Sequence, residues 1–150
     1  MAAGRASADG RSMAAFAALL LTGMLLGSML TYAVAMPRLA ARHLAPATAG
    51  PFVRAIQPVC QRAAAATALV AGVLAIGHLA GVLLVLVGIT LLLQLLWLGP
   101  AVERYGRRGL AGERSAMLTA IHLHRASLAI GLFQFLTGLI AFALILRQAG

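Results

Sequence analysis

The stretch from Ala63 to Leu98 limits what this chain can fold into more than any other part of the sequence. It contains 36 residues and no formally charged side chain. A helix crosses a hydrocarbon layer of about 30 Å with roughly 17 to 25 residues, so this stretch is too long for one membrane span and long enough for two. Its most polar part, Gly77-His78-Leu79-Ala80-Gly81, suits a turn because the glycines loosen a helix there. We therefore expect two spans that run in opposite directions.

Two other stretches have the length of single spans. Residues 14–36 end just before Pro37, which we interpret as a helix stop, and residues 126–146 end at Arg147. The first stretch is disfavoured as a cleaved signal peptide, because its apolar core exceeds the usual length of about 7 to 15 residues. We expect four membrane spans, over residues 14–36, 60–77, 82–98 and 122–146.

The expected fold class is all-α, an integral membrane four-helix bundle that forms one domain over residues 1–150. Short interfacial helices are expected before the second and fourth spans. Residues 49–62 alternate apolar and polar side chains, which favours a short helix on the membrane surface before the second span. Residues 113–125 are expected to extend the fourth span out of the membrane.

The charged residues are few and mostly basic. Hydrophobic residues make up 62% of the chain and charged residues 10%, whereas a soluble domain has about a quarter charged residues. Twelve arginines face three acidic residues and give a net charge of +9. The arginines are scattered between apolar stretches without aromatic stacking platforms, which argues against a nucleic-acid partner. They favour a lipid bilayer, whose anionic headgroups attract basic residues beside a span.

The distribution of arginine predicts an orientation. Basic residues accumulate in cytoplasmic loops, and nine of the arginines lie in residues 38–62 and 101–125. We expect a multi-pass protein of the bacterial inner membrane with these two segments cytoplasmic and both termini on the opposite side. Arg5 and Arg11, before the first span, argue for the reverse orientation of that span.

Small and polar residues within the apolar stretches predict the faces on which the helices pack, because lipid gives no hydrophobic drive for helix association. Gly23 and Gly27 form a GxxxG pair in the first span. In the fourth span, residues at alternating steps of three and four share one face: His124, Ser127, Gly131, Gln134, Gly138 and Ala141. Gln94 and Gln134 lie deepest, and we expect them to face inward and bond each other, Thr90 or Thr137. The alternative is a polar lining for a solute or lipid-headgroup path.

Most enzyme classes lack support in the sequence. No paired carboxylates lie near the spans, and no phosphate-binding glycine loop or HExxH pattern occurs. The lone Cys60 cannot form an intramolecular disulfide. Histidine is the remaining ligand type, with His43, His122 and His124 expected near one face and His78 near the other. We expect no cofactor, with a haem or metal site on His124, His122 or His43 as the alternative.

Four elements of the sequence, taken in order, carry a resemblance to a known family. They are Met36-Pro37-Arg38-Leu39 after the first span, Phe52 with Gln57-Pro58 before the second, Trp97-Leu98-Gly99-Pro100 after the third, and Leu123-His124-Arg125-Ala126-Ser127 at the start of the fourth. Over roughly residues 20–147 the chain resembles the uncharacterised multi-pass membrane proteins similar to transmembrane protein 205. The resemblance implies four spans and, since that domain has no known function, no mechanism. Gly131 and Gln57 depart from the family, which tends to have Asn and Phe there.

The leading functional hypothesis is a structural or accessory membrane component that acts through helix contacts, without enzymatic activity. Its expected partners are the lipid bilayer and another membrane protein or a second copy of the chain. A haem- or metal-associated membrane redox protein is one alternative. The other is a small-solute transporter, which would act as an oligomer because four short helices enclose little volume.

Overall fold

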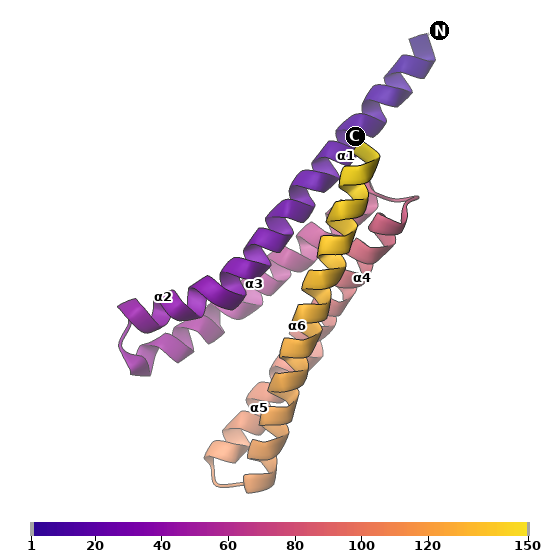
Figure 1. Cartoon of the computed structure of the whole chain (residues 1–150). Coiled ribbons are helices and arrows are strands. Elements are labelled where there is room, and N and C mark those ends of the chain that lie inside the picture. The colour runs from indigo at the N-terminus through magenta and orange to yellow at the C-terminus, as the bar shows by residue number, and fades with distance from the viewer. Residues whose placement is uncertain (1, 150) are drawn as a thin grey trace.

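The computed structural model describes the backbone of residues 2–149 and the side chains of residues 13–45 and 47–148. Within that part of the chain every regular element is helical, which confirms the all-α prediction. Four long helices dominate: α1 (Ala2–Leu30), α3 (Pro46–Leu74), α4 (Leu79–Leu93) and α6 (Arg114–Ala149). Helix α1 contacts α3 and α6, and α4 contacts the same two helices, so the four lie side by side (Figure 1).

Three helical segments are long and apolar enough to cross a membrane. They are Met13–His43, Leu79–Leu110 and Arg114–Gln148, each of which includes one long helix. Helix α3 is 29 residues long but carries Arg54, Gln57, Gln61 and Arg62 before Ala63, which lowers its mean hydropathy. Its second half belongs to the uncharged stretch that begins at Ala63 and packs against α4.

The chain turns back between α3 and α4 at residues 75–78. Gly77 adopts a φ of +93°, in the left-handed region that side chains with a Cβ disfavour. The amide of His78 donates to the carbonyl of Ala75 at 3.3 Å, and α4 begins at the next residue. The turn therefore overlaps the segment Gly77–Gly81, where the sequence places it.

The prediction that Pro37 stops the first long helix is wrong, and the helix also continues past residue 98, where the third span was expected to end. Each helix continues through a five-residue π-helical turn, η1 (Thr31–Ala35) or η2 (Gln94–Leu98), into a short helix, α2 (Met36–His43) or α5 (Gly99–Leu110). A proline ring clashes with the carbonyl four residues earlier, and for Pro37 and Pro100 that carbonyl lies inside the π-helical turn. The wider π-helical turn leaves room for the proline ring. The backbone hydrogen bonds change there from the i→i+4 to the i→i+5 pattern, and the helix continues.

The short helices occur at other residues than expected. Residues 49–62 are part of α3, which runs continuously through Pro51 and Pro58. The short amphipathic helix before α3 is α2, and the one before α6 is α5. Helix α6 begins at Arg114, so residues 114–125 do extend the last long helix. Each half of the chain thus repeats one order: a long helix, a π-helical turn, a short helix whose second residue is proline, and a long return helix.

Small and polar residues fill the interior, and large apolar side chains cover the outside. Alanine dominates the buried set, in which the largest apolar side chains are Leu25, Leu84 and Ile145. Polar members of that set are Thr22, Gln94, Gln134 and Thr137. Exposed apolar side chains occur on all four long helices and include Phe16, Met24, Val70, Val82, Leu132 and Ile140. This distribution suits a bundle surrounded by lipid, where packing and hydrogen bonds take the place of the hydrophobic effect.

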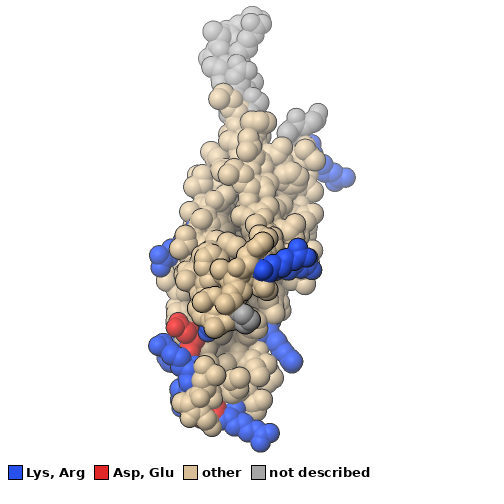
Figure 2. Space-filling view, turned by 90° about the vertical axis from the view of Figure 1, so that its left-hand side faces the viewer, with Lys and Arg blue, Asp and Glu red and all other residues tan. Residues whose placement is uncertain are grey.

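The two basic connections lie at the same end of the molecule. Figure 1 shows both chain ends and the α3–α4 turn at one end, and the α2–α3 and α5–α6 hairpins diverging at the other. In Figure 2 most basic side chains of the visible face lie in its lower half, with acidic ones among them near the bottom, and another lies higher up at the right-hand edge.

Candidate functional site: buried amides between α4 and α6

A hydrogen bond between the side chains of Gln134 and Thr90 joins α6 to α4. Gln134 is 1% exposed, and its Nε2 donates a hydrogen bond to Thr90 Oγ1 at 3.0 Å. The Thr90 hydroxyl donates in turn to backbone carbonyls of its own helix, that of Leu86 at 2.9 Å and that of Val87 at 3.0 Å. The expected bond between Gln134 and Thr90 is therefore present and links α6 to α4.

Gln94 forms a second bond to α6, from the π-helical turn that follows α4. It is buried at the start of η2, and its Nε2 donates to the backbone carbonyl of Ser127 at 3.0 Å. That carbonyl faces the next helical turn, where Gly131 has no side chain to cover it. Gln94 therefore bonds the backbone of α6 and not Gln134, Thr90 or Thr137, the partners that the sequence suggested.

One atom of this site is left without a partner. Gln134 Oε1 is buried and accepts no hydrogen bond from the described residues. The Thr90 hydroxyl cannot be the donor to Oε1. Its oxygen accepts the hydrogen bond from Gln134 Nε2, and its proton is donated to a backbone carbonyl within α4. A buried acceptor without a donor costs about 1 to 3 kcal/mol, so this oxygen is a free acceptor for any donor that reaches the α4–α6 interface.

The predicted polar face of α6 is buried only over part of its length. Gln134, Gly138 and Ala141 are buried, and Ser127 and Gly131 are half-buried. His124 is exposed, so the expectation that it packs within the bundle is wrong for this chain alone. The reason is geometric: at the level of His124 the neighbours of α6 have become η2 and α5, and the hairpins diverge (Figure 1).

The two glycines of the GxxxG pair in α1 also differ in their surroundings. A Cβ on Gly23 would lie 3.6 Å from Phe142 Cε2, so Gly23 sits at the α1–α6 contact. Gly27 is exposed and a Cβ there would meet nothing within 4 Å, so its interpretation as a packing residue is wrong for contacts within the chain. A Cβ on Gly131 would also meet nothing within 4 Å. Spacing alone does not tell which face of a helix meets a neighbour.

The closest helix contact at the described glycines lies between α3 and α4. A Cβ on Gly88 would lie 2.7 Å from Leu69 Cγ, and one on Gly72 would lie 2.7 Å from Val85 Cγ2. A Cβ on Gly81 would overlap the backbone of Ala75. Gly81 and Gly88 are seven residues apart, the spacing that returns to one face of a helix, and this signal could have identified them.

The histidines do not gather at this site. His43, His78, His122 and His124 are all exposed, and they lie on α2, before α4 and on α6. Within the described side chains, no group of three His, Cys, Asp or Glu residues is placed to hold a metal ion together. Cys60 is half-buried in α3 and has no disulfide partner. The hypothesis of a haem or metal site at His124, His122 or His43 stays a prediction.

No family profile, curated protein or solved structure matches this chain in comparisons of its sequence and fold. The resemblance to the proteins similar to transmembrane protein 205 stays an expectation drawn from the four sequence elements.

Proposed function

We propose that the protein is an integral membrane protein of four spans, formed by α1, α3, α4 and α6, in a bacterial inner membrane. Three of these helices have the length and hydropathy of spans. Support for α3 as the fourth comes from its place, since it packs against α1 and α4 along the uncharged half that follows Ala63. The exposed apolar side chains and buried amides fit lipid as the surrounding solvent.

The proposed orientation puts the α2–α3 and α5–α6 hairpins on the cytoplasmic side. These hairpins carry nine of the twelve arginines, and basic residues accumulate in cytoplasmic loops. Labelling of single cysteines in a Cys60→Ala background tests this orientation. With a membrane-impermeant thiol reagent, Ile76→Cys should react in intact spheroplasts, whereas Ala45→Cys and Ala111→Cys should react only after permeabilisation. Equal reaction of all three in intact cells would contradict the four-span proposal.

Within that membrane the protein acts as a structural or accessory component, through contacts of its helices. The observation that supports this function is that the side-chain amides of both buried glutamines form bonds between helical elements, Gln134 between α6 and α4 and Gln94 between η2 and α6. Their polar groups serve helix association, the usual use of amides in membrane bundles. The outward apolar faces, such as that with Leu132 and Ile140, are then available to lipid or to another membrane protein.

A second candidate function, passage of a small hydrogen-bond donor through an oligomer, draws on the free acceptor at Gln134 Oε1. Purified protein in proteoliposomes separates the two functions. The accessory role predicts no flux of water-sized or slightly larger polar solutes above that of empty vesicles. A flux that disappears in Gln134→Leu, with Gly27→Ala as the control variant, would establish transport instead. An optical spectrum of the same preparation tests the redox alternative, since a Soret band lost in His124→Ala would support bound haem.

A further inference from the structure

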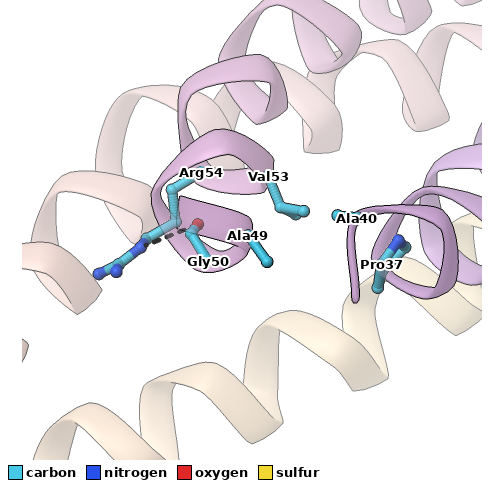
Figure 3. A pocket seen from close by; sticks show the side chains of 6 residues that line it. All are labelled: Pro37, Ala40, Ala49, Gly50, Val53 and Arg54. Atoms are coloured by element: carbon cyan, nitrogen blue, oxygen red, sulfur yellow. Dashed lines mark hydrogen bonds between the residues drawn. The ribbon is translucent and has the colours of Figure 1, made fainter. Parts of the chain in front are cut away.

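A shallow hollow lies where α2 folds against the start of α3. It is lined by Pro37, Ala40, Ala49, Gly50, Val53 and Arg54. In Figure 3, Ala49 and Val53 point toward Ala40 and Pro37 across the hollow, while Arg54 extends along the other side of Gly50. The lining is thus apolar and small at the centre, with one cation at the rim.

The Arg54 guanidinium has most of its donors free. Its Nε lies 3.4 Å from the carbonyl oxygen of Gly50, a long hydrogen bond that steers the side chain back over α3. No other hydrogen bond of Arg54 to a described residue is present, and the side chain is exposed. The two terminal amino groups therefore face outward as a planar fork, the geometry that binds phosphate oxygens in pairs.

No carboxylate neutralises this hairpin. Arg38, Arg42, Arg54 and Arg62 all lie on α2 and α3, and the sequence has no acidic residue between Asp9 and Glu103. The α5–α6 hairpin differs, although it has five arginines, because it also has two glutamates. There Arg108 bonds Glu113 through two contacts of 2.8 and 2.9 Å, and Arg107 lies 3.9 Å from Glu103. The two hairpins occupy equivalent places in the repeated order of helices. Their different charge pairing therefore indicates that they have different roles.

We propose that the α2–α3 hairpin binds an anionic phospholipid, with the phosphate on Arg54 and the glycerol and first acyl carbons in the hollow. This proposal rests on the proposed membrane placement, which puts the hairpin at headgroup level. Charge complementarity selects an anionic lipid over a zwitterionic one, because the hairpin has four cations and no anion. The apolar centre of the hollow selects a lipid over a free anion, since inorganic phosphate has nothing to place against Val53 and Ala40.

A fluorescent reporter beside the hollow tests the proposal on the whole protein. Trp97 is the single tryptophan, so Trp97→Phe combined with Phe52→Trp gives one emitter two residues from Arg54 on an exposed position. The protein is reconstituted in vesicles of phosphatidylcholine with a small share of brominated phosphatidylglycerol or brominated phosphatidylcholine. The proposal predicts stronger quenching by the brominated phosphatidylglycerol.

Variants give the matched comparison. Loss of an arginine from the site should lower the preference for phosphatidylglycerol about fivefold, the ratio to which about 1 kcal/mol near an anionic surface converts. Arg54→Gln should therefore lower the preference to about one fifth of that of the parent protein. Arg107→Gln, on the acid-paired hairpin, should leave it unchanged.

The outcomes separate the lipid site from the membrane placement. Equal quenching by both brominated lipids overturns the site while leaving the spans in place. Absence of quenching by either lipid contradicts the membrane placement of the hairpin itself. Loss of the phosphatidylglycerol preference on addition of inorganic phosphate, at an ionic strength matched with chloride, would show a plain anion site and overturn the lipid assignment.

Discussion

The amide nitrogen of Gln134 lies 3.0 Å from the hydroxyl oxygen of Thr90, while the amide oxygen of the same side chain has no partner. One half of this buried amide therefore stabilises the contact between α6 and α4, and the other half opposes it. Removal of the amide and removal of its partner are not equivalent changes.

We expect Thr90→Val to destabilise the bundle by about 1 kcal/mol, because it leaves both ends of the Gln134 amide unpaired. Gln134→Leu should change the stability by less than that, since it removes the unpaired oxygen together with the bond. The double variant should resemble Gln134→Leu. Reversible unfolding in mixed detergent micelles measures all three. A neutral Thr90→Val would show that the bond contributes nothing.

The space around two glycines predicts opposite effects on stability when each is replaced by alanine. Gly81→Ala should destabilise the fold by about 1 to 3 kcal/mol, because the new Cβ meets the backbone of Ala75, which cannot rotate away. Gly27→Ala should be neutral or stabilising by up to about 1 kcal/mol, since it adds helix propensity where the space is open. Thermal unfolding in detergent compares them. Equal losses at the two positions would mean that Gly27 contacts a second molecule.

The turn glycines have a different sensitivity, which comes from the backbone. Gly77 has a φ of +93°, and a Cβ there would meet nothing within 4 Å. Gly77→Ala should therefore destabilise by about 1 to 2 kcal/mol through backbone strain alone. Gly77→Asn should lose less, because asparagine tolerates that conformation better. Gly106→Ala, inside α5 with open space around it, is the control and should not destabilise. A harmless Gly77→Ala would mean that the turn adopts another conformation.

The pair Arg108–Glu113 closes the connection between α5 and α6, but both side chains are about half exposed, at 56% and 44%. Exposed pairs contribute about 0.2 to 1 kcal/mol, and salt screens them. Glu113→Gln should therefore lower the stability by less than about 1 kcal/mol at low salt, and the difference should vanish at high salt. A loss that persists at high salt would point to the hydrogen bonds of Glu113, such as that from Ser115, as the source.

Much of the fold could be predicted because uncharged length and glycine position leave few choices. The stretch from Ala63 to Leu98 had to double back, and its glycines marked the place. The depth of Gln134 within its apolar stretch was enough to predict that it faces inward and bonds Gln94, Thr90 or Thr137, since an unpaired amide in hydrocarbon is costly.

The incorrect predictions have a common origin. A sequence pattern shows on which face of its own helix a residue lies, but not which other helix packs against that face. Pro37 was predicted to end a helix, because nothing in a sequence reveals that a π-helical turn will accommodate the ring. Gly27 and His124 lie on plausible packing faces, yet the adjacent helices diverge before reaching them. Gly81 and Gly88 carry the closest contact, but within an apolar stretch they stood out only after α3 was known to lie beside them.

Helix α6 has 36 residues and no proline, which makes it about 54 Å long at about 1.5 Å per residue. With α6 crossing the bilayer as proposed, a hydrocarbon layer of about 30 Å leaves more than a third of it outside. Helix α5 packs along that outer part, where Gly109 lies against Met117. The two helices form a stiff extension into the aqueous phase. A protein that pulled or tilted the end of α6 near Arg114 would also move Gln134, because α6 is continuous between these two residues.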